Sequence, residues 1–443
     1  MSLLDILKNL STVELYMFIS AFLYPMARFV FPHIKSKYIN ALIHIIYGNI
    51  LSFALFGVKD SLIMVAFIII SYFLLFLPPW IAGFIGFSMT MATHVYIVLQ
   101  GVSWALDITG LSMVCFQKVF SLAWNLYDGK RLQEKKEVRK RASQLAVFER
   151  PNIFIYYAYL ITPYGGFTNP FIEFKVFDYM LNIGNRKEPL TSEDKYLALK
   201  RFIEAYLLSG FVAVTMKYMV WENYESQWYL NLNIVLKCFA IAALTAFSVT
   251  RYYCSWWVVE SGYYAFGLAS SNLYDNVKYE ISNLSLLEVL DSRSCQDWMR
   301  RWNHTTHLFF KNYLYARLMA QGFSSAFGNF AVFFVSMAWH GCRPVYFLLL
   351  PESFLIMEAD RVFCRKFPAK NIFWILIHDI FVCTTMLYCT STWFYPWVHN
   401  FIYVRKSVYC LPTVFSILMF FALKFVKTPK KPEEIKQKET KAE

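Results

Sequence analysis

Hydrophobic positions in this chain follow one another in long runs instead of alternating with polar positions. Apolar runs of roughly 17–25 residues are typical of helices that span a membrane. The pattern predicts such helices at residues 13–31, 38–57, 62–80, 81–99, 202–220, 230–249, 330–350, 372–388 and 404–425, with less regular candidates at 105–126, 153–166 and 253–269. We therefore expect an all-α polytopic membrane protein with about nine to eleven transmembrane or re-entrant helices.

The amino-acid composition supports this class. Hydrophobic residues make up 57% of the 443 residues and charged residues 16%, whereas soluble globular chains have about 45–50% apolar and about 25% charged residues. Because the loops between adjacent runs are very short, we expect one membrane domain over residues 1–426. The N-terminal segment lacks a basic stretch and a small-residue cleavage site, so the first span is expected to stay as an anchor.

Positive charge is concentrated in two segments. The formal net charge is +13, and the basic residues cluster at 128–144 and in the polar tail 427–443, which we expect to be disordered. Loops rich in Lys and Arg beside membrane spans are typically cytoplasmic, and they attract anionic lipids. We place both segments in the cytosol and expect no nucleic-acid binding, because the charge lies in short loops without a folded platform.

The cysteines form no recognisable pattern. There are nine, scattered mostly through apolar runs, and no CxxC pair occurs. Neither a zinc site nor a disulfide framework is indicated. We therefore expect no bound metal and no bound cofactor.

A narrow polar stripe runs along the apolar segment 330–350. At about 100° per residue, Asn329, Ser336 and His340 fall within a wedge of roughly 40°. Lipid cannot satisfy such side chains, so the stripe is expected to face protein or a water-filled chamber. Pro344 is expected to break the helix shortly after His340.

Other polar groups also lie in apolar surroundings. Asp107 and Lys118 are eleven residues apart and share a helical face, so each is a candidate partner for the other. Glu260 continues an aromatic face that includes Tyr253; packing accounts for the aromatic residues more readily than for the acid. Residues 297–317 are too polar to span a membrane and are expected to form an interfacial or partly inserted helix.

These parts suit acyl transfer to an alcohol. A buried histidine stays neutral and can accept a hydroxyl proton as a general base, and an Asn amide can orient that histidine or donate to a developing oxyanion. No GxSxG, HExxH or P-loop motif occurs. Two alternatives remain open at this point: His340 can be a structural histidine, and His378, beside Asp379, is an equally unusual intramembrane histidine.

Four motifs resemble one family of enzymes. The string WHGCRPVYF at 339–347 resembles the WHGxxPGY motif of membrane-bound O-acyltransferases, and RWNHTTHLFFKNYLYAR at 301–317 resembles their WNxxTxxWLxxxVYxR motif. The segment LDITGLSMVCFQKVFSLAWNLYDGK is similar to a D-x-T-G…K-x-x-S…DG segment of the lysophospholipid acyltransferase branch. RYYCSWW is similar to that branch's RxKYYxxW motif. The motifs occur in the family's order, and 37 residues separate Asn303 from His340.

The resemblance implies a belt of helices around a catalytic tunnel, in which an acyl chain passes from acyl-CoA to the free hydroxyl of a lysophospholipid. It implies His340 as the general base and Asn303 as its partner. Residues expected at the substrate, from the motifs or from their buried polarity, are Trp302, Thr306, Arg317, Arg251, Tyr252, Tyr253, Trp256, Glu260, Asp107, Lys118 and Ser336. By analogy we expect the endoplasmic reticulum membrane as the location, with a homodimer left open.

The sequence departs from the family motifs in places. Val345 replaces a Gly, Phe309 stands where a Trp is common, and Ile108 replaces Phe or Ser; these changes concern pocket shape and substrate choice. Acceptors such as diacylglycerol, a sterol or a protein remain alternatives, and a transporter is a more distant one. Asn303 also begins an N-glycosylation sequon, as do Asn9 and Asn283.

Overall fold

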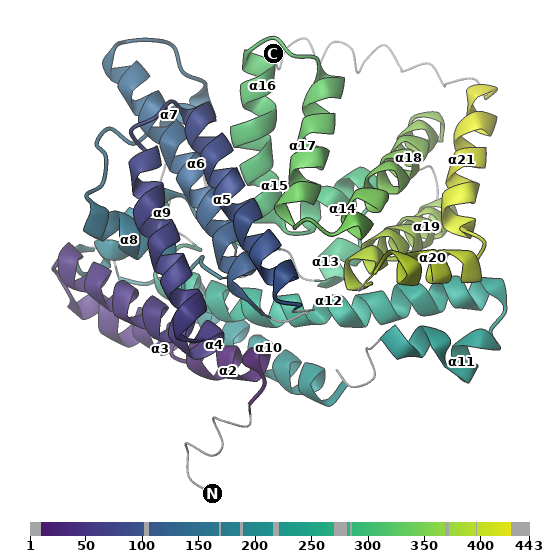
Figure 1. The fold of residues 1–443 in the computed structure, drawn as a ribbon, viewed down its shortest axis with the longest axis horizontal. Helices are drawn as coiled ribbons and strands as arrows, with labels where there is room; N and C mark the ends of the chain where they lie inside the picture. Colours follow the sequence, from purple (N-terminus) through teal and green to yellow (C-terminus); the bar gives the residue numbers. More distant parts are fainter. Residues whose placement is uncertain are drawn as a thin grey trace, which may run out of the picture. The chain divides into compact units, whose positions relative to one another are not determined.

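The computed structural model describes residues 10–101, 106–167, 170–186, 189–215, 221–269, 281–283, 286–367, 372–395 and 397–426. Within these ranges the chain is helical or irregular and contains no β-strand, as expected (Figure 1). It divides into two compact units. The first unit comprises Met1–Val220, Phe247–Leu286 and Trp302–Phe347, and the second comprises Trp221–Ala246, Leu287–Arg301 and Leu348–Glu443. The expected tail at 427–443 and the sequon at Asn9 lie outside the described residues.

The longest helix of the first unit, α4 (Lys37–Leu74), joins two of the expected spans. Ser36 caps its first turn by accepting a hydrogen bond from the Ile39 amide. Gly57 interrupts the helix with φ 74° and ψ 178°. Glycine adopts this conformation without the steric cost of a side chain, so the two apolar runs appear as one helix with a kink.

Helices α5 (Pro79–Leu99) and α6 (Ile108–Gln133) run side by side in the first unit (Figure 1). Pro79 begins α5, where a missing backbone N–H costs nothing. Polar contacts also join the pair, since the Thr93 and Ser112 hydroxyls are 2.7 Å apart. Helix α6 is buried on nearly every face. It therefore forms the centre of this unit and can hold polar groups away from lipid.

Further helices surround α4, α5 and α6 in the first unit. Helix α8 packs on α4, with a hydrogen bond of 2.7 Å between the Ser71 and Tyr156 hydroxyls. The bounds of the shorter helices in this unit are α2 (Thr12–Ser20), α3 (Leu23–Pro25), α7 (Lys140–Leu145), α8 (Ile153–Ile161), α9 (Phe174–Leu181), α10 (Ser192–Thr215), α15 (His304–Phe310), α16 (Ala316–Ala320) and α17 (Ser325–Trp339). Helices α12 (Ile234–Ala265), α13 (Leu286–Leu290) and α18 (Pro344–Lys366) contribute residues to both units.

The second unit contains α11 (Gln227–Leu230), α14 (Cys295–Arg301), α19 (Ile372–Thr390), α20 (Val398–Ser407) and α21 (Leu411–Lys424). A buried ion pair stabilises it: Arg405 lies 2.8 Å from Glu352 and stacks over the Tyr388 ring. Arg405 also donates to the Thr392 hydroxyl at 2.7 Å. A buried charge with this many partners is compatible with an apolar interior.

The helix break expected after His340 is present, but it does not fall at Pro344. Helix α17 ends at Trp339, His340 is its C-cap, and a new helix, α18, begins at Pro344. Gly341, with φ 130°, makes the break, so the chain turns three residues before the proline. Pro344 starts a helix instead of ending one, because proline suits the first helical turn. His340 therefore lies at a bend between two helices.

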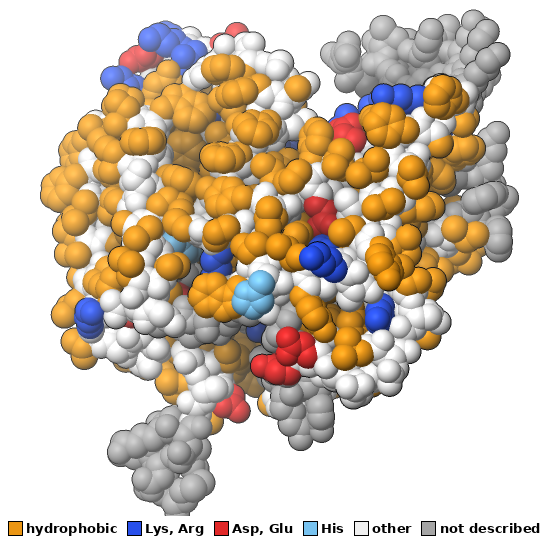
Figure 2. All heavy atoms as spheres, turned by 45° about the vertical axis from the view of Figure 1, so that its right-hand side comes forward, with side chains coloured by type: hydrophobic (Ala, Val, Ile, Leu, Met, Phe, Trp, Pro, Cys, Tyr) orange, Lys and Arg blue, Asp and Glu red, His pale blue; other side chains and the backbone are white. Residues whose placement is uncertain are grey.

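The hydrophobic surface fits a multi-pass membrane protein. By length and composition, five of the described helical segments can cross a membrane: Thr12–His33, Lys37–Leu74, Pro79–Leu99, Ile234–Ala265 and Ile375–Phe394. The pair α20 and α21, bent by 68°, adds a sixth if it is one span. Several other expected spans, among them 153–166 and 330–350, appear as short or broken helices. Hydrophobic side chains cover most of the face shown in Figure 2.

Candidate active site

The motif histidine is held at the end of α17 by its neighbour Trp339. The indole Nε1 of Trp339 donates to the Met113 carbonyl of α6 at 3.0 Å, and its ring lies 5.8 Å from the Phe310 ring of α15. The His340 ring packs on Trp339 at 4.8 Å. His340 is half-buried, and its backbone N–H donates to the Ser336 and Met337 carbonyls. Through Trp339, the end of α17 that carries His340 is thus tied to α6 and α15 of the first unit.

A second histidine supports this bend. His94 of α5 places Nε2 3.0 Å from the Trp339 carbonyl. Because a carbonyl oxygen only accepts, Nε2 of His94 carries the proton. A Cβ added to Gly341 would lie 3.0 Å from Nδ1 of His94, so the motif glycine is required both by its positive φ and by this close approach. Sequence reasoning missed His94, since nothing in its apolar run distinguishes it from a packed residue.

Charged groups gather around the two histidines. Asp107 and Arg343 lie within electrostatic range of His94. Arg343 is also within range of Tyr346, as are Arg251 and Tyr252. The structure therefore brings the expected residues Asp107, Arg251 and Tyr252 to the neighbourhood of the bend that carries His340.

Asn303 is held in an unusual backbone conformation. It precedes α15 with φ 43° and ψ 54°, in the left-handed region. Asn283, which is fully buried, donates from Nδ2 to the Asn303 side-chain oxygen at 3.3 Å, and its own oxygen accepts from the Thr305 amide at 3.0 Å. The hydrogen bond from Asn283 thus fixes the orientation of the Asn303 amide, whose NH2 group can act as a donor. The role of Asn303 in the reaction stays a prediction.

A carboxylate fixes Asn283 in turn. The Glu260 Oε1 atom accepts from the Asn283 backbone N–H at 2.9 Å, and its Oε2 lies 3.4 Å from Nε of Arg201. Glu260 was expected at the substrate, which stays a prediction; its described contacts are with Asn283, which positions Asn303, and with Arg201 of α10. Asn283 is also too deeply buried to carry a glycan in the folded chain.

The expected aromatic residues form one cluster. The Trp302 ring lies 6.3 Å from Tyr252, 6.2 Å from Tyr253 and 5.6 Å from Trp256, all in edge or T-shaped geometries. Such contacts stabilise beyond simple area burial. Trp302, the residue before Asn303, therefore ties the start of α15 to α12, while the expected contact of these aromatic residues with a substrate stays a prediction. Thr306, one turn further along, accepts from Gln117 of α6 at 3.2 Å.

The expected pairing of Asp107 with Lys118 is wrong. Asp107 is the N-cap of α6 and accepts from the Thr109 amide at 2.8 Å. Lys118 is fully buried and donates to the Tyr159 carbonyl at 2.6 Å while lying over the Tyr159 ring. Helix α6 is continuous, so eleven residues separate the two groups by about 16 Å. Lys118 therefore ties α6 to α8.

Arg317 of α16 makes a buried ion pair with Asp128, near the C-terminal end of α6. Its two terminal nitrogens are 2.9 and 2.5 Å from the Asp128 oxygens, and its guanidinium lies over the Trp124 ring. A bidentate pair of this kind fixes both side chains. These contacts of Arg317 hold α16 to α6 and do not by themselves indicate a substrate group. Ser336 is half-buried on α17, and its backbone carbonyl accepts a hydrogen bond from the backbone N–H of His340.

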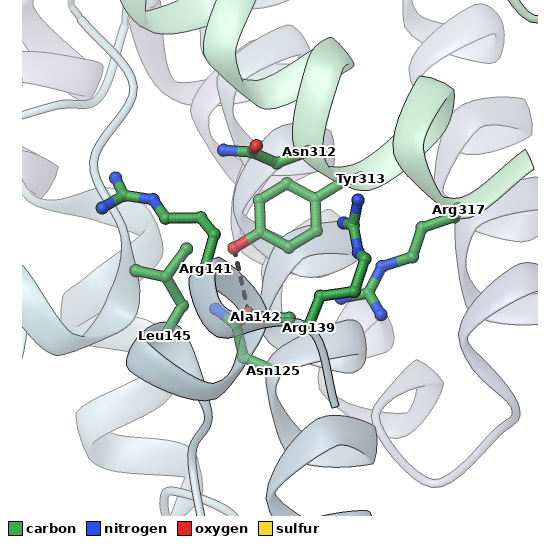
Figure 3. A pocket seen from close by; sticks show the side chains of 8 residues that line it. All are labelled: Asn125, Arg139, Arg141, Ala142, Leu145, Asn312, Tyr313 and Arg317. Carbon is green, nitrogen blue, oxygen red and sulfur yellow. Dashed lines mark hydrogen bonds between the residues drawn. The ribbon is translucent and has the colours of Figure 1, made fainter. Parts of the chain in front are cut away.

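A basic pocket lies beside this pair and is lined in part by Arg317 (Figure 3). In this view Arg141 lies to the left of the Tyr313 ring, and Arg139 and Arg317 lie to its right. The pocket is lined by Asn125, Arg139, Arg141, Ala142, Leu145, Asn312, Tyr313 and Arg317. From the sequence, the basic segment 128–144 was expected to set the orientation of the spans and to attract anionic lipids. In the structure Arg139 is the N-cap residue of α7 and Arg141 lies within it, and α7 packs on α6.

One buried acid lies behind the pocket. Glu173 accepts hydrogen bonds from Tyr313 at 2.7 Å and from Asn125 at 3.1 Å. Burial nevertheless raises the pKa of Glu173 to about 7, against the lowering effect of these hydrogen bonds and of Arg141. Near neutral pH this acid is therefore partly protonated, and the pocket keeps its positive character.

The rival histidine has another role. His378 belongs to the second unit, where its Nε2 atom lies 2.7 Å from Asp360 and its ring stacks on Phe363. Its partner is Asp360 instead of the adjacent Asp379, which pairs with Arg293. His378 is thus a hydrogen-bonded histidine with no described tie to the motifs around Asn303.

Comparison with known proteins agrees with the motifs. Lysophospholipid acyltransferase 1 of Arabidopsis thaliana is 24% identical over 417 residues, which cover 88% of each chain. Lysophospholipid acyltransferase 2 of the same plant is 23% identical over 406 residues, 84% of each chain. Membrane-bound glycerophospholipid O-acyltransferase 2 of Rattus norvegicus is 24% identical over 378 residues, 78% of this chain and 69% of that protein.

A family model described as MBOAT, membrane-bound O-acyltransferase family, matches residues 64–404. The match includes His94, Asn303 and His340, and it covers most of both described units. The chain therefore belongs to the membrane-bound O-acyltransferase family and is a multi-pass membrane O-acyltransferase.

Proposed function

We propose that this protein transfers an acyl chain from acyl-CoA to the free hydroxyl of a lysophospholipid. The observation that carries the proposal is the arrangement at the two motifs: His340 is fixed at a helix bend, and Asn303 has its amide oxygen engaged by Asn283. The names of the relatives, lysophospholipid acyltransferases and a glycerophospholipid O-acyltransferase, support the acceptor class.

In the proposed reaction the imidazole of His340 takes the proton of the lipid hydroxyl as its oxygen attacks the thioester carbon. The new C–O bond forms a tetrahedral intermediate, and the Asn303 NH2 group donates to its oxyanion. The C–S bond then breaks, and the imidazolium returns its proton to the departing thiolate. The products are a diacyl phospholipid and coenzyme A.

The basic pocket supports acyl-CoA as the donor. Coenzyme A carries phosphate groups at one end of a long pantetheine arm, and arginines are well suited to bind phosphate. Trp339 contacts α6 at Met113, and the pocket residue Asn125 lies twelve residues further along. A rise of 1.5 Å per residue places these points about 18 Å apart, a span that an extended pantetheine arm can bridge. We therefore assign the pocket to the phosphates of coenzyme A. By analogy with the family, we propose the endoplasmic reticulum membrane as the location of the protein.

An acceptor panel tests this function. Membranes from cells that lack their own activity would be given labelled acyl-CoA and, separately, lysophospholipids of different head groups, diacylglycerol, a sterol and a peptide. The proposal expects labelled diacyl phospholipid that depends on expression of the protein. If only the sterol, diacylglycerol or peptide were acylated, the acceptor assignment would be wrong; if acyl chains moved only from a phospholipid donor, the assignment of acyl-CoA would be wrong.

A further inference from the structure

Three side chains of the second unit converge into a possible ligand set for a metal ion. They are Asp360 and Cys364 of α18 and His378 of α19, whose oxygen, sulfur and nitrogen atoms all lie within 4.8 Å of one another. Asp360 and Cys364 are four residues apart, so they share a helical face, and His378 approaches from the neighbouring helix. We propose that this cluster binds a zinc ion or a similar borderline divalent cation.

The distances between the donor atoms fit such an ion. The Cys364 sulfur is 3.7 Å from Nε2 of His378 and 3.8 Å from Oδ1 of Asp360. A tetrahedral zinc with bonds of about 2.3 Å to sulfur and about 2.0–2.1 Å to nitrogen and oxygen separates sulfur from the lighter ligands by about 3.6 Å. Only the distance between Oδ1 of Asp360 and Nε2 of His378, 2.7 Å, is shorter than two ligands of one ion require, because these atoms share a hydrogen bond. If an ion replaced the bridging proton, the two atoms would have to move apart by about 0.7 Å.

The surroundings of the cluster orient its members. The backbone N–H of Cys295 donates to Oδ2 of Asp360 at 2.8 Å, which turns Oδ1 towards His378. Phe363 stacks on the His378 ring with centroids 5.1 Å apart and planes inclined by 13°. Contacts of this kind around the ligands fix ring and carboxylate orientation in metal sites. Asp379 is occupied by Arg293, and the Cys295 thiol lies beside Asp360 as a further donor close to the three ligands.

The chemistry of the donors selects the ion. A thiolate, an imidazole and a carboxylate together suit zinc, whereas magnesium and calcium prefer oxygen ligands alone. Asp360 is 1% exposed, and a buried carboxylate needs a compensating positive charge. Cys364 and His378 keep part of their surface accessible, so an ion can enter and a water molecule can complete the coordination. Binding requires Cys364 to release its thiol proton and His378 to carry its remaining proton on Nδ1.

The ion would fasten α18 to α19, in a part of the chain that the proposed acyl transfer does not use. The cluster could not be predicted from the sequence, because its ligands come from two helices and lack the short CxxC spacing of common zinc motifs. Since the proposal concerns metal content, it stands or falls independently of the acyl-transfer activity.

Metal analysis of the purified full-length protein in detergent tests the proposal. After incubation with zinc and removal of loosely bound ions, we expect close to one zinc per chain in the wild type. Cys364→Ala and His378→Ala should lose most of it, whereas Cys383→Ala, which removes a half-buried thiol of α19, and His399→Ala, which removes an exposed imidazole, should keep it. Zinc content that is negligible in the wild type, or equal in all variants, would overturn the proposal.

Cobalt substitution keeps the test valid if a variant fails to fold. The wild-type protein loaded with Co²⁺ should show a thiolate-to-cobalt charge-transfer band in the near ultraviolet and the visible bands of a tetrahedral site. Zinc added afterwards should remove both. The absence of the charge-transfer band in the folded wild type would mean that the cluster is a hydrogen-bonded triad without a metal.

Discussion

The Nε2 atom of His94 lies 3.0 Å from the carbonyl oxygen of Trp339, the residue that precedes His340. The hydrogen bond joins α5 to the end of α17, just before the chain turns at Gly341. The orientation of the proposed general base therefore depends on a second histidine that is about 245 residues away in sequence but adjacent in space.

The first prediction concerns this positioning role. His94→Ala should lower kcat by roughly 10- to 100-fold, because a small displacement of a reacting group is costly, while the KM for acyl-CoA changes little. His94→Gln retains an N–H donor of similar reach and should recover part of the rate. If the alanine and glutamine variants were equally impaired, or if only KM changed, the hydrogen bond to Trp339 would not be the reason that His94 matters.

The second prediction concerns Asn283. Replacing it by Ala removes the donor to Asn303 and leaves the Thr305 amide without its buried acceptor, which costs about 1–3 kcal/mol. We expect a lower kcat together with a lower unfolding temperature in detergent. Ser282→Ala, which alters the adjacent half-buried side chain, is the matched control. An Asn283→Ala protein with unchanged kcat would contradict the proposed orientation of the Asn303 amide.

The third prediction concerns the basic pocket. Arg141→Gln should raise the KM for acyl-CoA several-fold and leave the KM for the lysophospholipid unchanged, since the proposal places the lost charge beside the donor's phosphates and away from the lysophospholipid. The effect should shrink at high salt, which screens such attraction. Lys140→Gln, an exposed neighbour that does not line the pocket, is the control. Equal effects on the two substrates would contradict the assignment of this pocket to coenzyme A.

The fourth prediction follows from Glu173, whose pKa is raised to about 7. In the unfolded chain the pKa of Glu173 is near its ordinary value of 4.5. At a pH between 4.5 and about 7 the folded state therefore keeps a proton that the unfolded chain has lost. The stability that it contributes is complete below about pH 4.5 and is lost as the pH rises through 7. Glu173→Gln should therefore gain stability relative to the wild type between pH 5 and 8, by about 2–3 kcal/mol.

Unfolding temperatures across that pH range, in one detergent, provide the measurement for Glu173. The glutamine variant keeps an acceptor for the Tyr313 hydroxyl, so a loss of packing should not obscure the result. A wild-type protein that grows more stable than the variant from pH 5 to 8 would mean that Glu173 is ionised and paired in the folded state.

The sequence predicted the class of fold because bilayer thickness imposes a long apolar run on every spanning helix. The sequence predicted the positions of helix breaks less well. Two expected spans form one helix with a kink at Gly57, and another expected span is divided at Gly341. A glycine in an apolar run is compatible with a straight helix, a kink or a turn. Packing against other segments decides among them, as the approach of His94 to Gly341 shows.

The motifs singled out Trp302, Tyr252, Tyr253 and Trp256, which lie in one cluster, while their contact with a substrate stays a prediction. The residues that support the site could not be predicted from the sequence. Asn283 lies in a sequon that suggested a surface position, yet it is buried beside Asn303. Such contacts join segments far apart in the chain, and no local pattern of hydrophobicity or spacing carries that information.

The most direct test of the account compares His340→Ala with His33→Ala, an exposed histidine of the same unit. Membranes with equal amounts of each protein would be given labelled acyl-CoA and lysophospholipid, and diacyl phospholipid would be measured. We predict that His340→Ala loses activity by on the order of 10²-fold or more, as expected when a general base is removed, and that His33→Ala matches the wild type. Full activity in His340→Ala would contradict the central claim that this imidazole accepts the proton of the lipid hydroxyl.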